Sequence, residues 1–202
     1  MQSELSRRDF VATSLAGLAG FYAGNATAAD TSSASPAPTA GEDGYKLWLR
    51  YAPPGEAAEQ YRRTVRQIVV EENSDTARII RAELSSALAA LMGSAVHIGQ
   101  EGLQDGALIA GTPKNSSAIR GMGWEEDLAR LGPEGFVIRS ATTANHPVIA
   151  IASEGEIGAL YGAYHFLRLM QTGRPIARLN VTERPKVQLR LINHWDNLNG
   201  SI

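Results

Sequence analysis

The stretch RQIVVEENSDTARIIRAELSSALAALMG, residues 66–93, is the part of the chain that best predicts its fold. Residues 66–70 form a short apolar run that is typical of a strand. Residues 75–92 follow as a helix, with Ser74 placed to cap its beginning and Gly93 to end it. The apolar side chains that recur at helical spacing on one face are Ile80, Leu84, Ala87, Leu88 and Leu91. A strand followed directly by such a helix is typical of proteins in which helices cover a sheet.

Further strands are expected on both sides of this unit. Alternating or short apolar runs predict strands at residues 46–51, 95–98, 107–111, 136–139 and 148–151. The last two are expected to be joined by a turn around residues 145–147, and a short helix is expected over 125–131. A final extended stretch runs from about Leu179 to Trp195, interrupted by Pro185.

A second long helix is predicted to begin at Ser153. Glu156 stands three residues on, the spacing of a capping box, and Gly173 supplies the end. Its expected apolar face consists of Ile157, Leu160, Tyr161, Tyr164 and Leu167. The elements together predict an α/β (more broadly α+β) fold in two layers, one sheet backed by two main helices.

The N-terminal region has the order of features found in export signals. Adjacent Arg7 and Arg8 precede a weakly apolar run over 10–23, which is too short for a stable membrane span, and the small residues 26–28 suit a signal peptidase. Residues 1–29 therefore resemble a twin-arginine signal peptide, which predicts a periplasmic or secreted protein. Residues 30–41 contain no large apolar side chain and are expected to be a flexible linker.

Composition excludes several classes of function. The 202 residues carry a net charge of -2, so no basic excess indicates nucleic acid. Cysteine is absent, which excludes disulfides and thiol nucleophiles. The four histidines fall in four different predicted elements, so no metal or other cofactor is expected. The loop over 111–116 lacks the spacing of a phosphate-binding loop, and the acidic runs at 71–72 and 125–127 are expected to be solvated surface.

The segment RLINHWDNLNG, residues 190–200, has the composition of a sugar site. An apolar strand ends in a cluster of hydrogen-bonding side chains around one indole, and an indole face can stack on a sugar ring. The candidate binding residues are Asn193, His194, Trp195, Asp196 and Asn197. A strand-end turn at Asn199-Gly200 with a buried Trp explains the same pattern equally well.

This segment is similar to the one that opens the catalytic barrel of α-glucuronidases of glycoside hydrolase family 67. Residues 42–51, 110–113 and 158–167 also resemble the N-terminal domain of that family. The resemblance implies an α/β front domain over 42–186, like the one that precedes the barrel in β-hexosaminidases. Residues 187–202 would then be the start of a (β/α)8 barrel that is otherwise absent.

The resemblance also implies a function for the parent protein. Family members remove terminal 4-O-methylglucuronic acid from glucuronoxylan-derived oligosaccharides, with inversion and without a cofactor, and a homodimer is conceivable at full length. The Trp matching Trp195 lies beside the uronic acid pocket. Inversion needs two opposed carboxyl groups, and no residue here matches a catalytic position. The chain alone is therefore expected to be inactive and to be a truncated reading frame.

Two other interpretations stay open at this point. A free-standing periplasmic carbohydrate-binding or interaction module would keep the front domain and dispense with the barrel. A front domain of the β-hexosaminidase type is the weaker alternative, since the run over 193–197 favours the α-glucuronidases.

Overall fold

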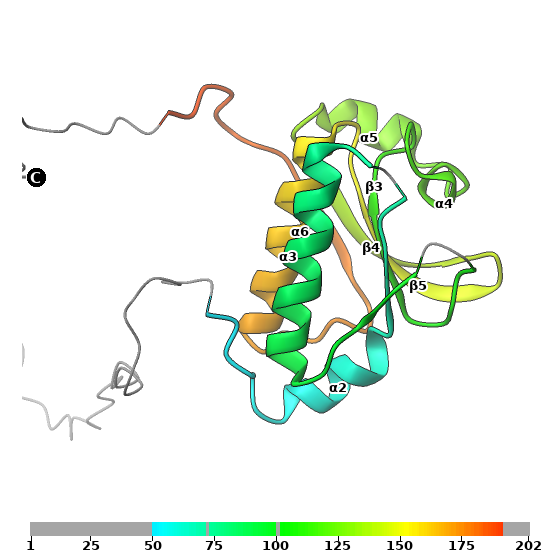
Figure 1. Ribbon diagram of the computed structural model, residues 1–202. Helices are drawn as coiled ribbons and strands as arrows, with labels where there is room; N and C mark the ends of the chain where they lie inside the picture. Colours follow the sequence, from blue (N-terminus) through cyan, green and yellow to red (C-terminus); the bar gives the residue numbers. More distant parts are fainter. Residues whose placement is uncertain (1–49, 72, 100–101, 192–202) are drawn as a thin grey trace, which may run out of the picture. The chain divides into compact units, whose positions relative to one another are not determined.

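The computed structural model describes residues 50–71, 73–99 and 102–191. Six strands form one sheet in the order β2-β1-β3-β5-β4-β6 (Figure 1). The strands are β1 (Gln67–Val69), β2 (His97–Ile98), β3 (Ala107–Gly111), β4 (Phe136–Thr143), β5 (His146–Ala152) and β6 (Asn180–Glu183). The helices are α2 (Ala57–Thr64), α3 (Asp75–Met92), α4 (Ser117–Arg120), α5 (Glu125–Leu131) and α6 (Glu156–Gln171). The mixed α/β class predicted from the sequence is thus confirmed.

One strand of the sheet, β4, runs against all the others. β2, β1, β3 and β5 are parallel neighbours, whereas β4 runs antiparallel to both β5 and β6. The turn that joins β4 to β5 contains Ala144 and Asn145, both at positive φ (47° and 67°), as a two-residue hairpin requires. Since β6 is antiparallel to β4, it runs in the direction of β5. The carboxyl ends of β1, β3, β5 and β6 therefore point to the same edge.

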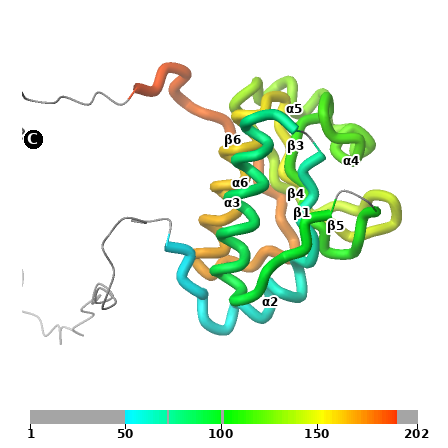
Figure 2. Tube along the Cα trace, in the orientation of Figure 1, coloured from blue at the N-terminus to red at the C-terminus, as the bar shows by residue number. Residues whose placement is uncertain are grey.

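Helices α3 and α6 lie side by side over one face of the sheet (Figures 1 and 2). The predicted apolar face of α3 is confirmed, because all five of its side chains are buried in the larger hydrophobic cluster. Leu108 of β3 and Ile138 of β4 belong to the same cluster. This layer is the one that the sequence predicted.

The other face of the sheet is also covered, which corrects the expectation of two layers. Ile109 and Val137 belong to a second hydrophobic cluster that includes Ile119 of α4 and Leu128 of α5. Because α4 has four residues and α5 has seven, they show little helical periodicity in the sequence. The strand β3 is buried along its whole length, as is typical of parallel strands covered on both sides.

The predicted apolar face of α6 is confirmed at Leu167, which is buried, and at Leu160, which packs against the core, but it is wrong at Ile157 and Tyr161. Ile157 and Tyr161 are 43% and 38% exposed, while Gly158, Ala159, Gly162 and Ala163 are buried. The small residues allow close packing: a Cβ atom on Gly162 would lie 2.5 Å from the Cγ2 atom of Ile151. The helix therefore packs through its smallest side chains, which hydropathy alone does not indicate. The capping box is also absent, since Gly155 occupies the N-cap position without a side-chain hydrogen bond.

The structure contains two helices that the sequence did not predict, α4 and α2. α2 has eight residues, and its apolar side chains are Ala57, Ala58 and Tyr61, too few to mark a helix in the sequence. Its side chains stabilise the C-terminal ends of the two long helices: the Tyr61 hydroxyl donates to the carbonyl of Arg174 at 2.8 Å, and Arg62 donates to the carbonyl of Met92 at 2.5 Å. These bonds satisfy carbonyls that have no partner at helix ends.

The two predicted extended stretches at the ends of the domain are shorter than expected or lie elsewhere. Arg50 and Tyr51 are not part of a strand, and residues 46–49 lie outside the described residues. Of the stretch predicted over 179–195, only Asn180–Glu183 is a strand within the described residues. Its continuation over 184–191 is called the exit segment below.

Candidate functional site

The five candidate sugar-binding residues lie outside the described residues, so their roles stay predictions. These residues are Asn193, His194, Trp195, Asp196 and Asn197. The structure describes the approach to them, which is the exit segment. The candidate site is therefore built from this segment and the surface beside it.

The exit segment has the residue alternation of a strand without a strand partner among the described residues. Val187, Leu189 and Leu191 are 61%, 74% and 80% exposed, and polar residues alternate with them. One polar residue attaches the segment to the domain. The Arg190 guanidinium donates to a carboxylate oxygen of Glu134 at 2.5 Å and lies 5.7 Å from the centre of the Tyr161 ring. This contact combines a charge-assisted hydrogen bond with a cation–π contact.

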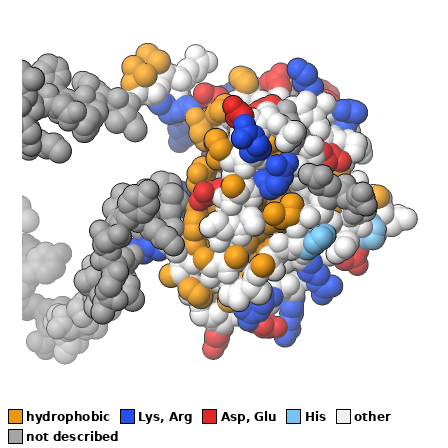
Figure 3. All heavy atoms as spheres, in the orientation of Figure 1, with side chains coloured by type: hydrophobic (Ala, Val, Ile, Leu, Met, Phe, Trp, Pro, Cys, Tyr) orange, Lys and Arg blue, Asp and Glu red, His pale blue; other side chains and the backbone are white. Residues whose placement is uncertain are grey.

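A groove of about 530 Å³ separates the exit segment from helix α6. We call it the α6 groove; the side chains that define it are Tyr161, His165 and Arg168 on the helix and Arg184, Lys186 and Arg190 on the chain after β6. Its volume lies in the range of about 300–1,000 Å³ that small-molecule sites occupy. Figure 3 shows hydrophobic side chains along this side of the domain, with Lys and Arg side chains where the chain leaves it.

His165 is the titratable side chain on the helical wall of the α6 groove. Burial lowers its pKa below the usual range, and the nearby positive charge of Arg168 acts in the same direction, while Glu183 opposes both. The ring packs edge-on against Phe136, with the ring centres 5.5 Å apart. His165 is therefore neutral near pH 7 and packs against Phe136.

A smaller hollow of about 300 Å³ adjoins the α6 groove and is lined by Tyr51, Tyr164 and His165 among others. The Tyr51 hydroxyl donates to the carboxylate of Glu83 at 2.5 Å. Burial raises the pKa of Tyr51 strongly, and the hydrogen bond to Glu83 adds to this effect. Burial likewise raises the pKa of Tyr164. Tyr51 also adopts a positive φ of 51°, so the chain is held in a strained conformation where it enters the domain.

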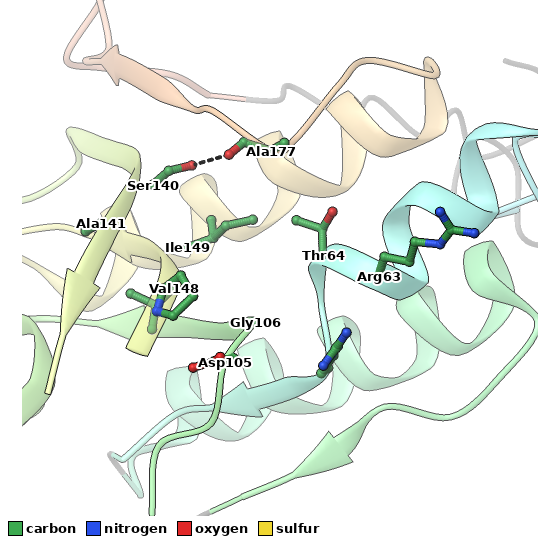
Figure 4. A pocket seen from close by; sticks show the side chains of 11 residues that line it. Arg63, Thr64, Asp105, Gly106, Ser140, Ala141, Val148, Ile149 and Ala177 are labelled. Carbon is green, nitrogen blue, oxygen red and sulfur yellow. Dashed lines mark hydrogen bonds between the residues drawn. The ribbon is translucent and has the colours of Figure 1, made fainter. Parts of the chain in front are cut away.

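A third cavity, of about 340 Å³, lies at the amino ends of the parallel strands (Figure 4). Thr64 precedes β1, Gly106 precedes β3, and Val148 begins the buried part of β5. The Ser140 hydroxyl donates to the carbonyl of Ala177 across this cavity at 3.3 Å. Open α/β sheets bind ligands at the carboxyl ends of their strands. This cavity is at the opposite edge and is the weaker candidate.

The carboxyl edge between β1 and β3 is occupied by the protein's own carboxylate. Glu156, in the first turn of α6, accepts hydrogen bonds from the Ser74 hydroxyl at 2.7 Å and the Asn115 amide at 3.3 Å. Ser74 in turn accepts a hydrogen bond from the amide of Ala77 and caps α3. The loop over 111–116 turns into α4, where Ser116 is the N-cap, so it is a structural loop, as predicted. A negative side chain thus stands where such folds place anionic ligands.

The acidic runs singled out in the sequence form ordinary surface contacts. Glu71 accepts a hydrogen bond from Ser117, and Asp127 pairs with Arg139 at 3.0 Å and with Arg130 at 2.7 Å. Hydrogen bonds from these two arginines hold the pKa of Asp127 below its usual range. A general acid needs a raised pKa. No group of three or more metal-ligating side chains occurs within the described ranges.

Family comparison identifies the class of protein that this fold belongs to. The model named "Glycosyl hydrolase family 67 N-terminus" matches residues 47–166, which is more than half of the 202-residue chain. The chain therefore belongs to this family, as the resemblance predicted.

Its curated relatives are α-glucuronidases from fungi. The chain is 30% identical to "Probable alpha-glucuronidase A" of Aspergillus oryzae over 81% of its own length and 19% of that protein. It is 29% identical to "Alpha-glucuronidase A" of Emericella nidulans over 78% of its length and 18% of that protein. The chain thus spans about a fifth of the length of these relatives.

The chain also overlaps in part with a solved structure. A family GH115 4-O-methyl-alpha-glucuronidase with specificity for decorated arabinogalactans overlaps 52% of this chain and 13% of its own. The TM-score is 0.41 at 21% identity, which is too low for an argument about fold or function.

Proposed function

We propose that this chain is the non-catalytic front domain of an exported α-glucuronidase. The complete enzyme would hydrolyse terminal (4-O-methyl)glucuronic acid from xylan-derived oligosaccharides with inversion. Membership of the family supports the general activity, and the match to about a fifth of each relative supports the role of a front domain. Among the described residues, arginines lower the pKa values of Glu59 and Asp127, which does not suit a general acid.

The observation that carries this proposal is the apolar row of the exit segment. Val187, Leu189 and Leu191 alternate with polar residues and are all more than 60% exposed. An exposed apolar strand edge invites pairing and aggregation, and proteins normally cover it. A (β/α)8 barrel that begins with this segment would pair it on both sides and bury its apolar row. Trp195 and its neighbours would then stand at the carboxyl end of the first barrel strand, where barrel enzymes bind substrates.

The native size of the protein tests this proposal. An antibody against residues 50–191 would capture the protein from exporting cells, and its mass and its release of 4-O-methylglucuronic acid would be measured. The relatives are about five times as long as the matched stretch, because that stretch is 19% of the protein. We expect a species several times the 21.6 kDa of this chain, with activity in the captured material. A short, inactive species would contradict the proposal.

The alternative is a free-standing carbohydrate-binding module, and the α6 groove is the observation that favours it. The groove is large enough for a sugar and carries an exposed aromatic ring at Tyr161. This interpretation predicts that the short species is the native protein and that it is monomeric and soluble. The enzyme therefore predicts a large native species and the binding module a short one, so the same mass measurement distinguishes them.

We also propose that residues 1–29 direct export through the twin-arginine route. The described residues contain no helix long and apolar enough to cross a membrane. Fusion of residues 1–29 to a folded reporter tests the signal, with Arg7→Lys/Arg8→Lys as the inactive version and an Arg→Lys pair on the reporter as control. Retention of the reporter by the variant alone supports the proposal, and equal export of both would contradict it.

A further inference from the structure

The α6 groove has an excess of positive charge. Four cations line it, Arg168, Arg184, Lys186 and Arg190, against the two carboxylates of Glu134 and Glu183. Arg190 is neutralised by Glu134 at 2.5 Å. Arg184 and Lys186 have no hydrogen-bonding or ion-pair partner within the part of the chain that the structure describes, and both are exposed. The two free cations therefore stand on the exit segment facing a helix that carries a further arginine.

The opposite wall of the same groove supplies an aromatic surface. Tyr161 is 38% exposed on α6, and Arg190 holds its ring in place from one side. The groove wall continues through His165 to Phe136, whose rings pack edge-to-face. Aromatic rings with one exposed surface bind the C–H faces of sugars, and cations bind carboxylates.

We propose that the α6 groove binds an acidic oligosaccharide, with the carboxylate of a uronic acid on Arg184 and Lys186 and a neighbouring sugar ring on Tyr161. This site is separate from Trp195 and its neighbours and would hold a second part of the polymer. The inference deepens the proposed function, because that function names a uronic acid as the sugar removed. The observations behind this inference are the positions of charged and aromatic side chains within the front domain.

A second occupant, the downstream polypeptide itself, fits the groove less well. Burying Arg184 and Lys186 against protein would remove two unpaired cations from water, which costs several kcal/mol for each ion unless carboxylates are supplied. Val187 lines the groove together with Arg184, Lys186 and Arg190. Leu189 and Leu191 are exposed and do not line it, so they are the part of the apolar row that suits a protein partner.

Calorimetric titration of the full 202-residue chain tests the proposal directly. The probe is xylotriose bearing one 4-O-methylglucuronic acid, and neutral xylotetraose and a galacturonic acid trimer are the comparison ligands. We expect the acidic xylo-oligosaccharide to bind about tenfold more tightly than xylotetraose, as two exposed ion pairs would allow. The difference should vanish in 1 M NaCl, where the screening length is about 3 Å. Equal affinity for the acidic and neutral ligands would overturn the proposal.

Variants locate the binding and separate it from charge alone. Arg184→Ser/Lys186→Ser should abolish the preference for the acidic ligand, whereas Arg174→Ser/Arg178→Ser removes two exposed cations outside the groove and should preserve it. Tyr161→Phe should bind normally and Tyr161→Ala should weaken both xylo-oligosaccharides. Equally tight binding of the galacturonic acid trimer would also support the proposal, because that ligand carries uronic acid carboxylates as well.

These measurements involve no turnover, so they are independent of the test of the enzyme. An inactive native protein whose groove still binds the acidic probe would contradict the proposed function and support the groove. An active enzyme whose front domain does not bind the acidic probe would support the proposed function and contradict the proposal about the groove.

Discussion

Substitution of Gly162 by Ala tests how closely α6 packs on the sheet. The added Cβ atom would lie 2.5 Å from the Cγ2 atom of Ile151 and 3.3 Å from two ring carbons of Phe136. Ile151 is fully buried in the central part of β5, so its Cγ2 atom has little room to move. Overpacking costs about 1–3 kcal/mol, and a contact of 2.5 Å with a buried atom belongs in the upper part of that range, about 2–3 kcal/mol. The better helix propensity of Ala returns about 1 kcal/mol. We therefore expect a net loss of about 1–2 kcal/mol.

Thermal and urea unfolding of the full chain would measure this loss. A domain of this size loses about 2–4 °C in Tm per kcal/mol, so Tm should fall by about 2–8 °C. Adding Ile151→Leu removes the branch at Cβ and should recover part of the loss in a double-mutant cycle. Gly121→Ala is the matched control, because its Cβ atom would lie 3.4 Å from the nearest atom and its φ is negative. A Gly162→Ala variant more stable than the wild type would refute the close packing.

Three further predictions concern polar contacts. The pKa of Asp127 is lowered in the folded state. Its contribution to stability is therefore present above the unfolded pKa and is lost as pH falls through the folded pKa. Asp127→Asn should reduce the loss of stability at acid pH, measured by urea unfolding at a series of pH values. Tyr51→Phe removes the 2.5 Å hydrogen bond to Glu83 and should cost about 1–3 kcal/mol by the same assay, and an unchanged midpoint would show that the bond contributes nothing. Ser74→Ala should cost about 1 kcal/mol and speed amide exchange in the first turn of α3, whereas Ser74→Thr keeps a hydroxyl that can cap α3 and donate to Glu156 and should preserve protection there.

The sequence predicted helices and strands most accurately where their formation depends on residues close together along the chain. The bounds of α3, β3 and α5 agree with the predicted ranges; α3 has a clear apolar period with end signals, and β3 is an uninterrupted apolar run. α2 has few apolar side chains and is held by hydrogen bonds from Tyr61 to carbonyls at the end of α6, which lie 109 and 113 positions further along the chain.

The buried face of α6 shows the limit of hydropathy. The large side chains of Ile157 and Tyr161 suggested a core face, yet Gly158 and Gly162 lie closest to the sheet. Which face of α6 is buried depends on the distance between the helix and the sheet, and this distance cannot be read from the sequence. The exposed Tyr161 then became available to the α6 groove. The groove itself joins residues of α6 to the chain after β6 and has no signature in either segment alone.

The strand order has a practical consequence for labelling this protein. β4 runs antiparallel to both β5 and β6. The β4–β5 turn therefore lies at one edge of the sheet, and the exit segment, which follows β6, leaves from the opposite edge. A dye attached at Asn145 would therefore be remote from the α6 groove, and one at Gln188 would stand beside it. Energy transfer between the two dyes would measure the distance from the β4–β5 hairpin to the exit segment. A change in this distance would report movement of the exit segment when an oligosaccharide or a second domain arrives.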